Sequence, residues 1–121
     1  MKRNAGEEFL FKDEEILKID SPRKNLRGPW LVVKKDAVKR WAMVAMHWRG
    51  TEKEVWKPCF GIRWFWSTQG MPHVVNCATW FVLPEVFNPY VFKELESNPE
   101  LKERIEKIFA TGEDYSRCSE I

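Results

Sequence analysis

Seven tryptophans lie in this chain of 121 residues, and five of them fall between Trp41 and Trp66. An indole side chain needs a deep core if it is buried, and it makes an adhesive surface if it is exposed. We therefore expect the fold to be built around this tryptophan-rich middle segment. Any functional surface is expected to touch the same segment.

Two segments of this region alternate in side-chain character, which is typical of β-strands. In residues 40–49, one side of the strand carries Ala42, Val44, Met46 and Trp48. In residues 58–67, one side carries Phe60, Ile62, Trp64 and Trp66. Shorter apolar runs at 30–34 and 77–83 complete an antiparallel sheet of about four strands, for which both an open, strongly curved shape and a barrel-like shape are compatible with the pattern. Residues 21–29, with two prolines and Gly28, are predicted to form a loop.

The hydrophobic period becomes helical after Pro84. Asn88-Pro89 and Asn98-Pro99 each place an asparagine cap before a proline at the first helical position. They predict two C-terminal helices, over residues 89–96 and 99–110. Strands followed by helices predict an α+β fold with both helices on one face of the sheet. The predicted helix-covered face carries Val44, Met46, Trp48, Phe60, Ile62, Trp64 and Trp66.

Length and composition predict a single domain over residues 1–121, with loose termini at 1–8 and 113–121. Residues 9–19 fit either a short helix that begins near Asp13 or a strand. The polar start of the chain predicts no secretory segment, and no apolar run is long enough for a membrane span. Three cysteines without a CxxC pair predict a reducing, cytoplasmic location rather than a disulfide framework.

The second sheet face is the predicted binding face, because it mixes aromatic and charged side chains. Its predicted ligand-binding residues are Trp41, Met43, His47, Arg49, Arg63 and Phe65. Such a face can line a pocket, pair with a second copy of the chain or hold a flat ligand. Alternatively, residues 9–19 or the C-terminal tail cover it. If the two strands are neighbours, Arg49 and Arg63 can clamp a carboxylate or phosphate.

These patterns favour a small non-catalytic domain without a cofactor, which binds a small apolar or anionic ligand or a protein partner as a homodimer. A first alternative is a single-stranded nucleic-acid-binding module that uses sheet aromatics and the basic region 23–40. A second alternative is an enzyme with a nucleophile pair of Cys77 and His73. His47 and Cys59 with this pair are too scattered for a zinc site, so no metal is expected.

Overall fold

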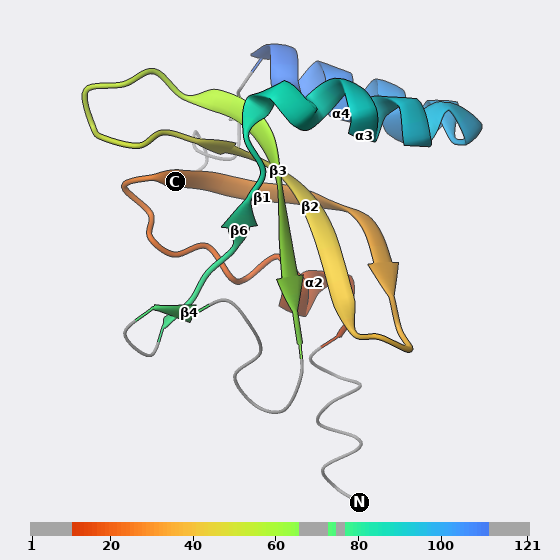
Figure 1. The fold of residues 1–121 in the computed structure, drawn as a ribbon, viewed down its shortest axis with the longest axis horizontal. Coiled ribbons are helices and arrows are strands. Elements are labelled where there is room, and N and C mark those ends of the chain that lie inside the picture. The colour runs from red at the N-terminus through yellow and green to blue at the C-terminus, as the bar shows by residue number, and fades with distance from the viewer. Residues whose placement is uncertain (1–10, 66–72, 75–76, 112–121) are drawn as a thin grey trace, which may run out of the picture.

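The computed structural model describes residues 11–65, 73–74 and 77–111 (Figure 1). Its main sheet has four antiparallel strands in the order β1-β2-β3-β6, with bounds Leu26–Asp36, Trp41–Trp48, Lys57–Trp64 and Phe81–Val82. A separate two-stranded sheet contains β4 (His73–Val74) and β5 (Cys77–Ala78). The helices are α2 (Asp13–Ile16), η1 (Glu85–Phe87), α3 (Asn88–Glu94), η2 (Leu95–Ser97) and α4 (Pro99–Thr111).

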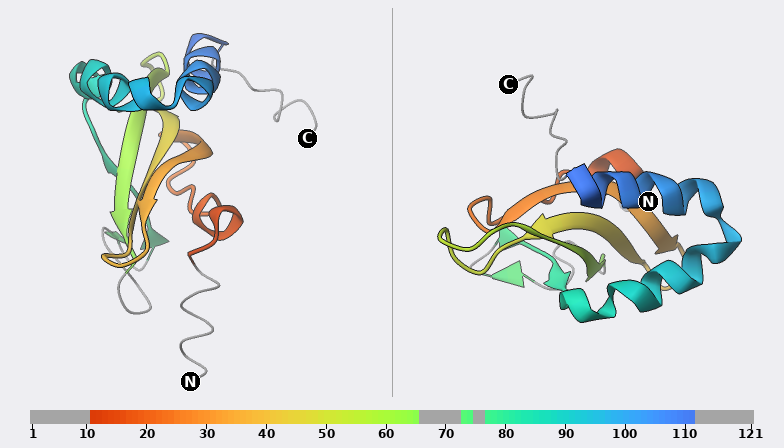
Figure 2. Two further views of the ribbon diagram at one scale, coloured as in Figure 1. Left: turned by 90° about the vertical axis from the view of Figure 1, so that its right-hand side faces the viewer. Right: turned by 90° about the horizontal axis from the view of Figure 1, so that it is seen from above.

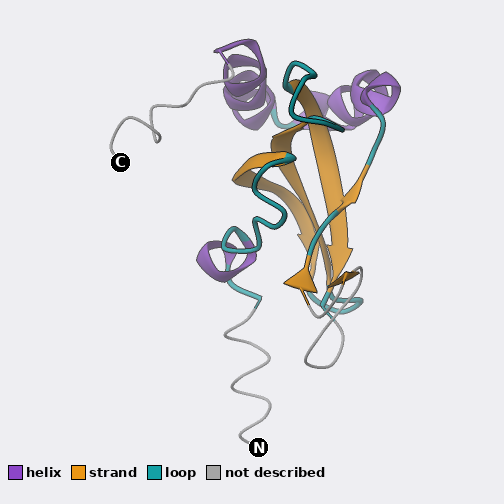
Figure 3. Ribbon diagram, turned by 90° about the vertical axis from the view of Figure 1, so that its left-hand side faces the viewer, coloured by secondary structure: helices purple, strands orange, loops and turns teal. Residues whose placement is uncertain are grey.

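This architecture confirms the predicted α+β fold with an antiparallel sheet. The described strands form an open sheet and no barrel, because β1 and β6 are its two edges. Helices α3 and α4 cross one end of the sheet, and α2 lies beside the sheet at a distance from them (Figures 2 and 3). In the described part of the chain, no helix is both long enough and apolar enough to cross a membrane.

Two predicted strands differ from the structure in their bounds. β1 begins at Leu26, within the predicted loop, and its pairing with β2 is irregular between Arg27 and Leu31. That irregularity accommodates Gly28, at φ +98°, and the following proline in an edge strand. The predicted strand 77–83 is divided, since Cys77–Ala78 pairs with β4 and only Phe81–Val82 joins the main sheet. Trp66 and both predicted loose termini lie outside the described residues.

The register between β2 and β3 corrects the predicted sheet faces. Ala45 pairs with Phe60, and Val44 pairs with Gly61. Side chains of directly paired residues lie on the same face of a sheet. The prediction placed the apolar side of β2 and Phe60 on the same face. In the structure they lie on opposite faces of the sheet. A relative shift of one residue moves every side chain of a strand to the other face.

Helices α3 and α4 pack with one face of the sheet to form the helix-side core. Its buried members are Leu31, Val33, Ala45, Phe60, Leu95 and Ile105. The apolar stripe predicted for α4 is confirmed, because Leu101, Ile108 and Phe109 pack around Ile105 in this core. The ring of Phe60 lies 5.2 Å from that of Phe109 and 5.7 Å from that of Phe92. Aromatic contacts of this kind fix the helices against the middle of β3.

The N-terminal segment covers the other face of the sheet and forms the N-terminal-side core, whose buried members are Phe11, Ile16, Leu26, Ala42, Val44, Met46, Cys59, Phe65 and Trp80. Two hydrogen bonds attach this segment to the chain before β6. The indole of Trp80 donates to the carbonyl of Ile19 at 2.6 Å, and the hydroxyl of Thr79 donates to the carbonyl of Ser21 at 2.8 Å. Of the alternatives for the second face, coverage by the N-terminal segment is therefore the one found for residues 11–19.

The two Asn-Pro pairs have different structural roles. The side chain of Asn98 accepts a hydrogen bond from the amide of Leu101 at 3.3 Å, so the predicted cap of α4 is confirmed. Asn88 instead lies inside α3 as its first residue, and its side-chain amide donates to the carbonyl of Pro58 at 2.9 Å. The prediction that Asn88 caps a helix was wrong, because the cap position of α3 is Phe87 and no side-chain oxygen caps this helix.

Candidate functional site

The six residues of the predicted binding face are divided between three places. Trp41, Met43 and His47 lie on the helix side of β2, since their strand partners are Trp64, Ile62 and Pro58. Arg63 and Phe65 lie toward the N-terminal side, with the core residues Ala42 and Trp80. Arg49 follows the end of β2. The predicted single aromatic and arginine-bearing face was therefore wrong, for the reason of register given above.

His47 is a buried structural residue of the helix side. Its Nδ1 accepts a hydrogen bond from the indole of Trp30 at 2.9 Å. Its ring also makes edge contacts with Trp30 and Phe109. Burial lowers the pKa of His47; the backbone of Phe109 opposes this shift, and the charge of Arg27 adds to it. The ring is therefore neutral near pH 7, and Nδ1 is already used as an acceptor.

Arg63 is buried at the other end of the sheet. Its Nη1 donates to the carbonyl of Thr79 at 3.0 Å, and its guanidinium lies 5.2 Å from the ring centre of Phe65. Burial lowers the pKa of Arg63 to about 10, so the side chain stays charged at neutral pH. The predicted clamp with Arg49 was wrong, because the two arginines lie near opposite ends of β3.

Arg49 organises the connection between β2 and β3. Its guanidinium donates to the carbonyls of Lys24 and Glu52, at 2.9 and 3.3 Å. It also stacks on the indole of Trp56 at 4.1 Å, and Arg27 lies 4.4 Å from the centre of the same ring. These contacts hold the connection against the start of β1 and leave Arg49 with a largely structural role.

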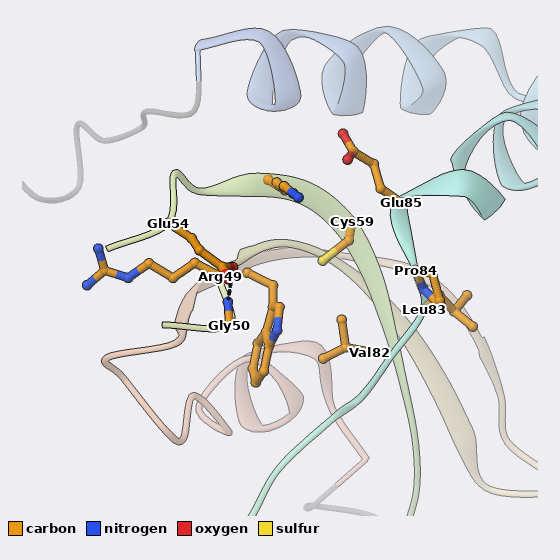
Figure 4. Close-up of a pocket in the computed structure, with 10 residues that line it drawn as sticks. Arg49, Gly50, Glu54, Cys59, Val82, Leu83, Pro84 and Glu85 are labelled. Carbon is orange, nitrogen blue, oxygen red and sulfur yellow. Dashed lines mark hydrogen bonds between the residues drawn. The ribbon is translucent and has the colours of Figure 1, made fainter. Parts of the chain in front are cut away.

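A pocket of about 280 Å³ opens between this connection and β6 (Figure 4). We call it the sheet-end pocket, and it is lined by Trp48, Arg49, Gly50, Glu54, Lys57, Cys59, Val82, Leu83, Pro84 and Glu85. The side chains of Cys59 and Val82 point into it, whereas the guanidinium of Arg49 points away (Figure 4). The pocket lies at the margin of the N-terminal-side core, to which Trp48, Cys59 and Val82 belong.

The floor of the sheet-end pocket is apolar, and its rim is charged. Burial raises the pKa of the Cys59 thiol to about 12, with a smaller contribution from Glu85. The thiol is therefore protonated at neutral pH and behaves as a small apolar group rather than as a nucleophile. On the rim, the carboxylate of Glu54 accepts a hydrogen bond from the amide of Gly50 at 2.9 Å. Lys57 and Glu85 supply two further rim charges of opposite sign.

The basic region 23–40 spans the whole length of β1. Arg23 and Lys24 precede β1, whereas Lys39 and Arg40 follow it, and an 11-residue strand separates the two groups by roughly 30 Å. Arg23 is paired with Asp20 at 3.1 Å, and Lys35 is paired with Asp13 at 2.8 Å. Arg27, Lys34 and Lys35 lie on β1 between these groups, and the nucleic-acid alternative stays a prediction.

The predicted chemical sites gain no support from the backbone. In the small hairpin, His73 pairs with Ala78 and Val74 pairs with Cys77, so the two proposed catalytic residues are not strand partners. Their side chains lie outside the described part of the structure, and the enzyme alternative stays a prediction. His47 and Cys59 lie on opposite faces of the sheet, and the described residues contain no cluster of three metal-ligating side chains.

Comparison of the chain with protein-family models, curated proteins and solved structures gives no match. The choice of a site therefore depends on the geometry of the described residues. Sequence reasoning missed Trp48, Cys59 and Val82, because their common surface is produced by the register of β3 with both neighbours. One signal was available: residues 50–55 are hydrophilic and begin with Gly50, which is typical of a connection between strands, and such connections often border binding sites.

Proposed function

We propose that this protein is a small-molecule-binding domain without catalytic activity, and that its ligand occupies the sheet-end pocket. One observation supports this proposal most directly: a pocket of about 280 Å³ has an apolar floor and a rim that carries charges of both signs. Ligand sites in proteins typically combine these features. The protonated thiol of Cys59 adds shape and apolar contact but no nucleophile.

The lining residues indicate the class of ligand. Trp48, Cys59 and Val82 favour an apolar body, preferably aromatic because an indole and a thiol are both good neighbours for a ring. Lys57 and Glu85 favour a charged head group that remains at the rim. The ligand we propose is therefore a small aromatic molecule with an ammonium group, a carboxylate or both. A cytoplasmic location, predicted from cysteine usage, is part of the same proposal.

Saturation-transfer NMR of the full chain tests this proposal with three probes: phenylalanine, benzoate and benzylamine. We expect weak binding, with dissociation constants of about 1 mM, because a probe of this size buries little surface. Phenylalanine should give the strongest transfer, since its head group matches both rim charges. If none of the three probes shows saturation transfer, the proposal is contradicted.

A matched pair of substitutions assigns the binding to the pocket. Val82→Phe fills the sheet-end pocket and should abolish the transfer. Val55→Phe makes the same chemical change at an exposed position outside the pocket, and it should leave the transfer unchanged. Equal loss in both variants would show that the probes bind elsewhere.

A further inference from the structure

Two arginines share one indole at the end of the sheet where β2 passes into its connection with β3. Arg27 pairs with His47, and Arg49 lies two residues beyond His47, so both arginine side chains are on the helix side. The register of β2 with β3, continued by one residue, places Trp56 opposite Arg49. The strand register therefore brings two guanidinium groups and an indole together.

The shared indole limits the distance between the two positive charges. The guanidinium carbon lies 4.4 Å from the centre of the Trp56 ring in Arg27 and 4.1 Å from it in Arg49. The two carbons are therefore no farther apart than the sum of these distances. A phosphate group that accepts hydrogen bonds from two guanidinium groups holds their carbons within about 8 Å of each other. The separation set by the indole is thus compatible with one phosphate between both arginines.

Neither guanidinium forms an ion pair with a carboxylate in the described part of the chain. Arg27 is exposed and donates no side-chain hydrogen bond to another described residue. Arg49 uses Nε and Nη1 for backbone carbonyls, which fixes its orientation and leaves Nη2 without an acceptor among the described residues. Two neighbouring positive charges with unused donors form a site for an anion.

A groove of about 620 Å³ adjoins the two arginines. It is lined by Lys24, Asn25, Gly50, Thr51, Glu52 and Lys53. Arg49 donates to the carbonyls of Lys24 and Glu52, so its guanidinium lies beside this groove. The lining carries two lysines against one glutamate, which keeps the local charge positive. The groove offers room for the rest of a molecule whose anionic group lies on the arginines.

We propose that Arg27 and Arg49 bind a phosphate group beside Trp56, either as free phosphate or as part of a small phosphate ester. Charge selects an anion, and the number of donors selects phosphate over a carboxylate. A carboxylate has two oxygens and is matched by one guanidinium fork, whereas a phosphate has further oxygens for a second fork. This site is separate from the sheet-end pocket, from which the guanidinium of Arg49 points away (Figure 4).

NMR titration of the full, isotope-labelled chain tests this proposal, at constant ionic strength because salt screens exposed charges. The probes are inorganic phosphate and glycerol phosphate, and acetate is the carboxylate control. The indole N–H signal of Trp56, identified by its loss in Trp56→Phe, should shift and saturate with both phosphates. Acetate should bind at least about tenfold more weakly, since it engages one fork. Tighter binding of the ester would identify an ester as the ligand, and tighter binding of inorganic phosphate would identify the free ion.

Arg27→Gln should raise the dissociation constant of both phosphates by at least about fivefold, because charge-assisted hydrogen bonds are lost. Arg27 is substituted rather than Arg49, since its side chain is exposed and the variant is expected to fold. Arg23→Gln is the matched control, because it removes the same charge from an exposed arginine that is already paired with Asp20. It should leave both dissociation constants unchanged.

Three results would overturn the proposal: no saturable shift of the Trp56 signal with either phosphate, equal weakening by Arg27→Gln and Arg23→Gln, or acetate that binds as tightly as phosphate. Equal weakening would show a general effect of charge rather than a site. Val82→Phe, which fills the sheet-end pocket, should leave phosphate binding unchanged. The two proposals therefore fail independently.

Discussion

At the residue scale, His47 shows how the fold uses a neutral imidazole. Nδ1 accepts from the indole of Trp30, and the ring packs against Phe109 of α4. A protonated ring has no acceptor for the Trp30 indole. It would also place a positive charge near Arg27 inside a largely apolar site. The histidine is therefore a structural element whose protonation opposes folding.

We expect the free energy of unfolding to fall as the pH is lowered below the ordinary pKa of 6.5, because burial lowers the pKa of folded His47. The unfolded chain then binds a proton that the folded chain does not, so stability is lost by at most about 1.4 kcal/mol per pH unit. The loss ends once the pH is below the folded pKa as well. Urea unfolding between pH 7.5 and pH 5 measures it.

His47→Asn should remove most of this pH dependence, since the asparagine side chain does not titrate. It should also lower the stability at pH 7 by about 1–3 kcal/mol, through lost ring contacts. His73→Asn is the control, because the chain has two histidines. A pH dependence that disappears in the His73 variant and persists in the His47 variant would contradict the assignment.

The candidate site was only partly predictable at this scale. Aromatic and arginine residues around β2 were predicted to bind a ligand, and in the structure Arg49 and Arg63 donate hydrogen bonds to backbone carbonyls. Trp48 was predicted to lie on the helix-covered face and Cys59 was weighed only as a zinc ligand, although both line the sheet-end pocket. Composition shows that such residues are present. Whether they face a cavity depends on neighbouring strands that a local pattern does not specify.

At the element scale, four strands and two helices were predictable. The register of the strands, and so the sheet face on which each side chain lies, was not. β2 and β3 are apolar on both sides, so alternation identified them as strands but left two registers possible. Asn98 was predictable as a cap because helix capping is local. The role of Asn88 was not, because its partner, the carbonyl of Pro58, is 30 residues away.

Gly61→Ala should destabilise the protein by about 1–3 kcal/mol, because β3 and Trp80 approach closely at this glycine. A Cβ atom there would lie 2.9 Å from the Met46 sulfur and 3.1 Å from the Trp80 Cβ. Gly50→Ala is the control, since its Cβ would meet mainly the end of the Glu54 side chain, which can shift more easily than a packed backbone. Urea unfolding of both variants measures the difference, and a Gly61 variant as stable as the Gly50 variant would contradict this packing.

At the scale of the whole molecule, one sheet separates two cores. Ile16 is fully buried in the N-terminal-side core, and Ile105 is fully buried in the helix-side core. The two cores come from opposite ends of the chain, but both use side chains of β2 and β3. Neither core can be lost without exposing one face of the shared strands, so we expect a single cooperative unit.

Ile16→Ala and Ile105→Ala should each lower the free energy of unfolding by about 2–5 kcal/mol, through lost burial and a residual cavity. Both variants should still unfold in one transition, followed by far-ultraviolet circular dichroism and tryptophan fluorescence. Leu17→Ala, at a partly buried neighbour, should cost less. Separate transitions for the two spectroscopic signals would show that the cores are independent.

The position of β2 between two partner strands and two cores also affects how this sequence can change. Ala42, Val44, Ala45, Met46 and His47 are buried, and Met43 is half-buried. A strand with one face exposed to solvent tolerates polar replacements at every second position. β2 has no such alternate positions, so its tolerance should be low over consecutive residues, as in the central strand of a three-layer protein. We therefore expect substitutions to be tolerated mainly at the ends and connections of this strand, including the residues that border the pocket.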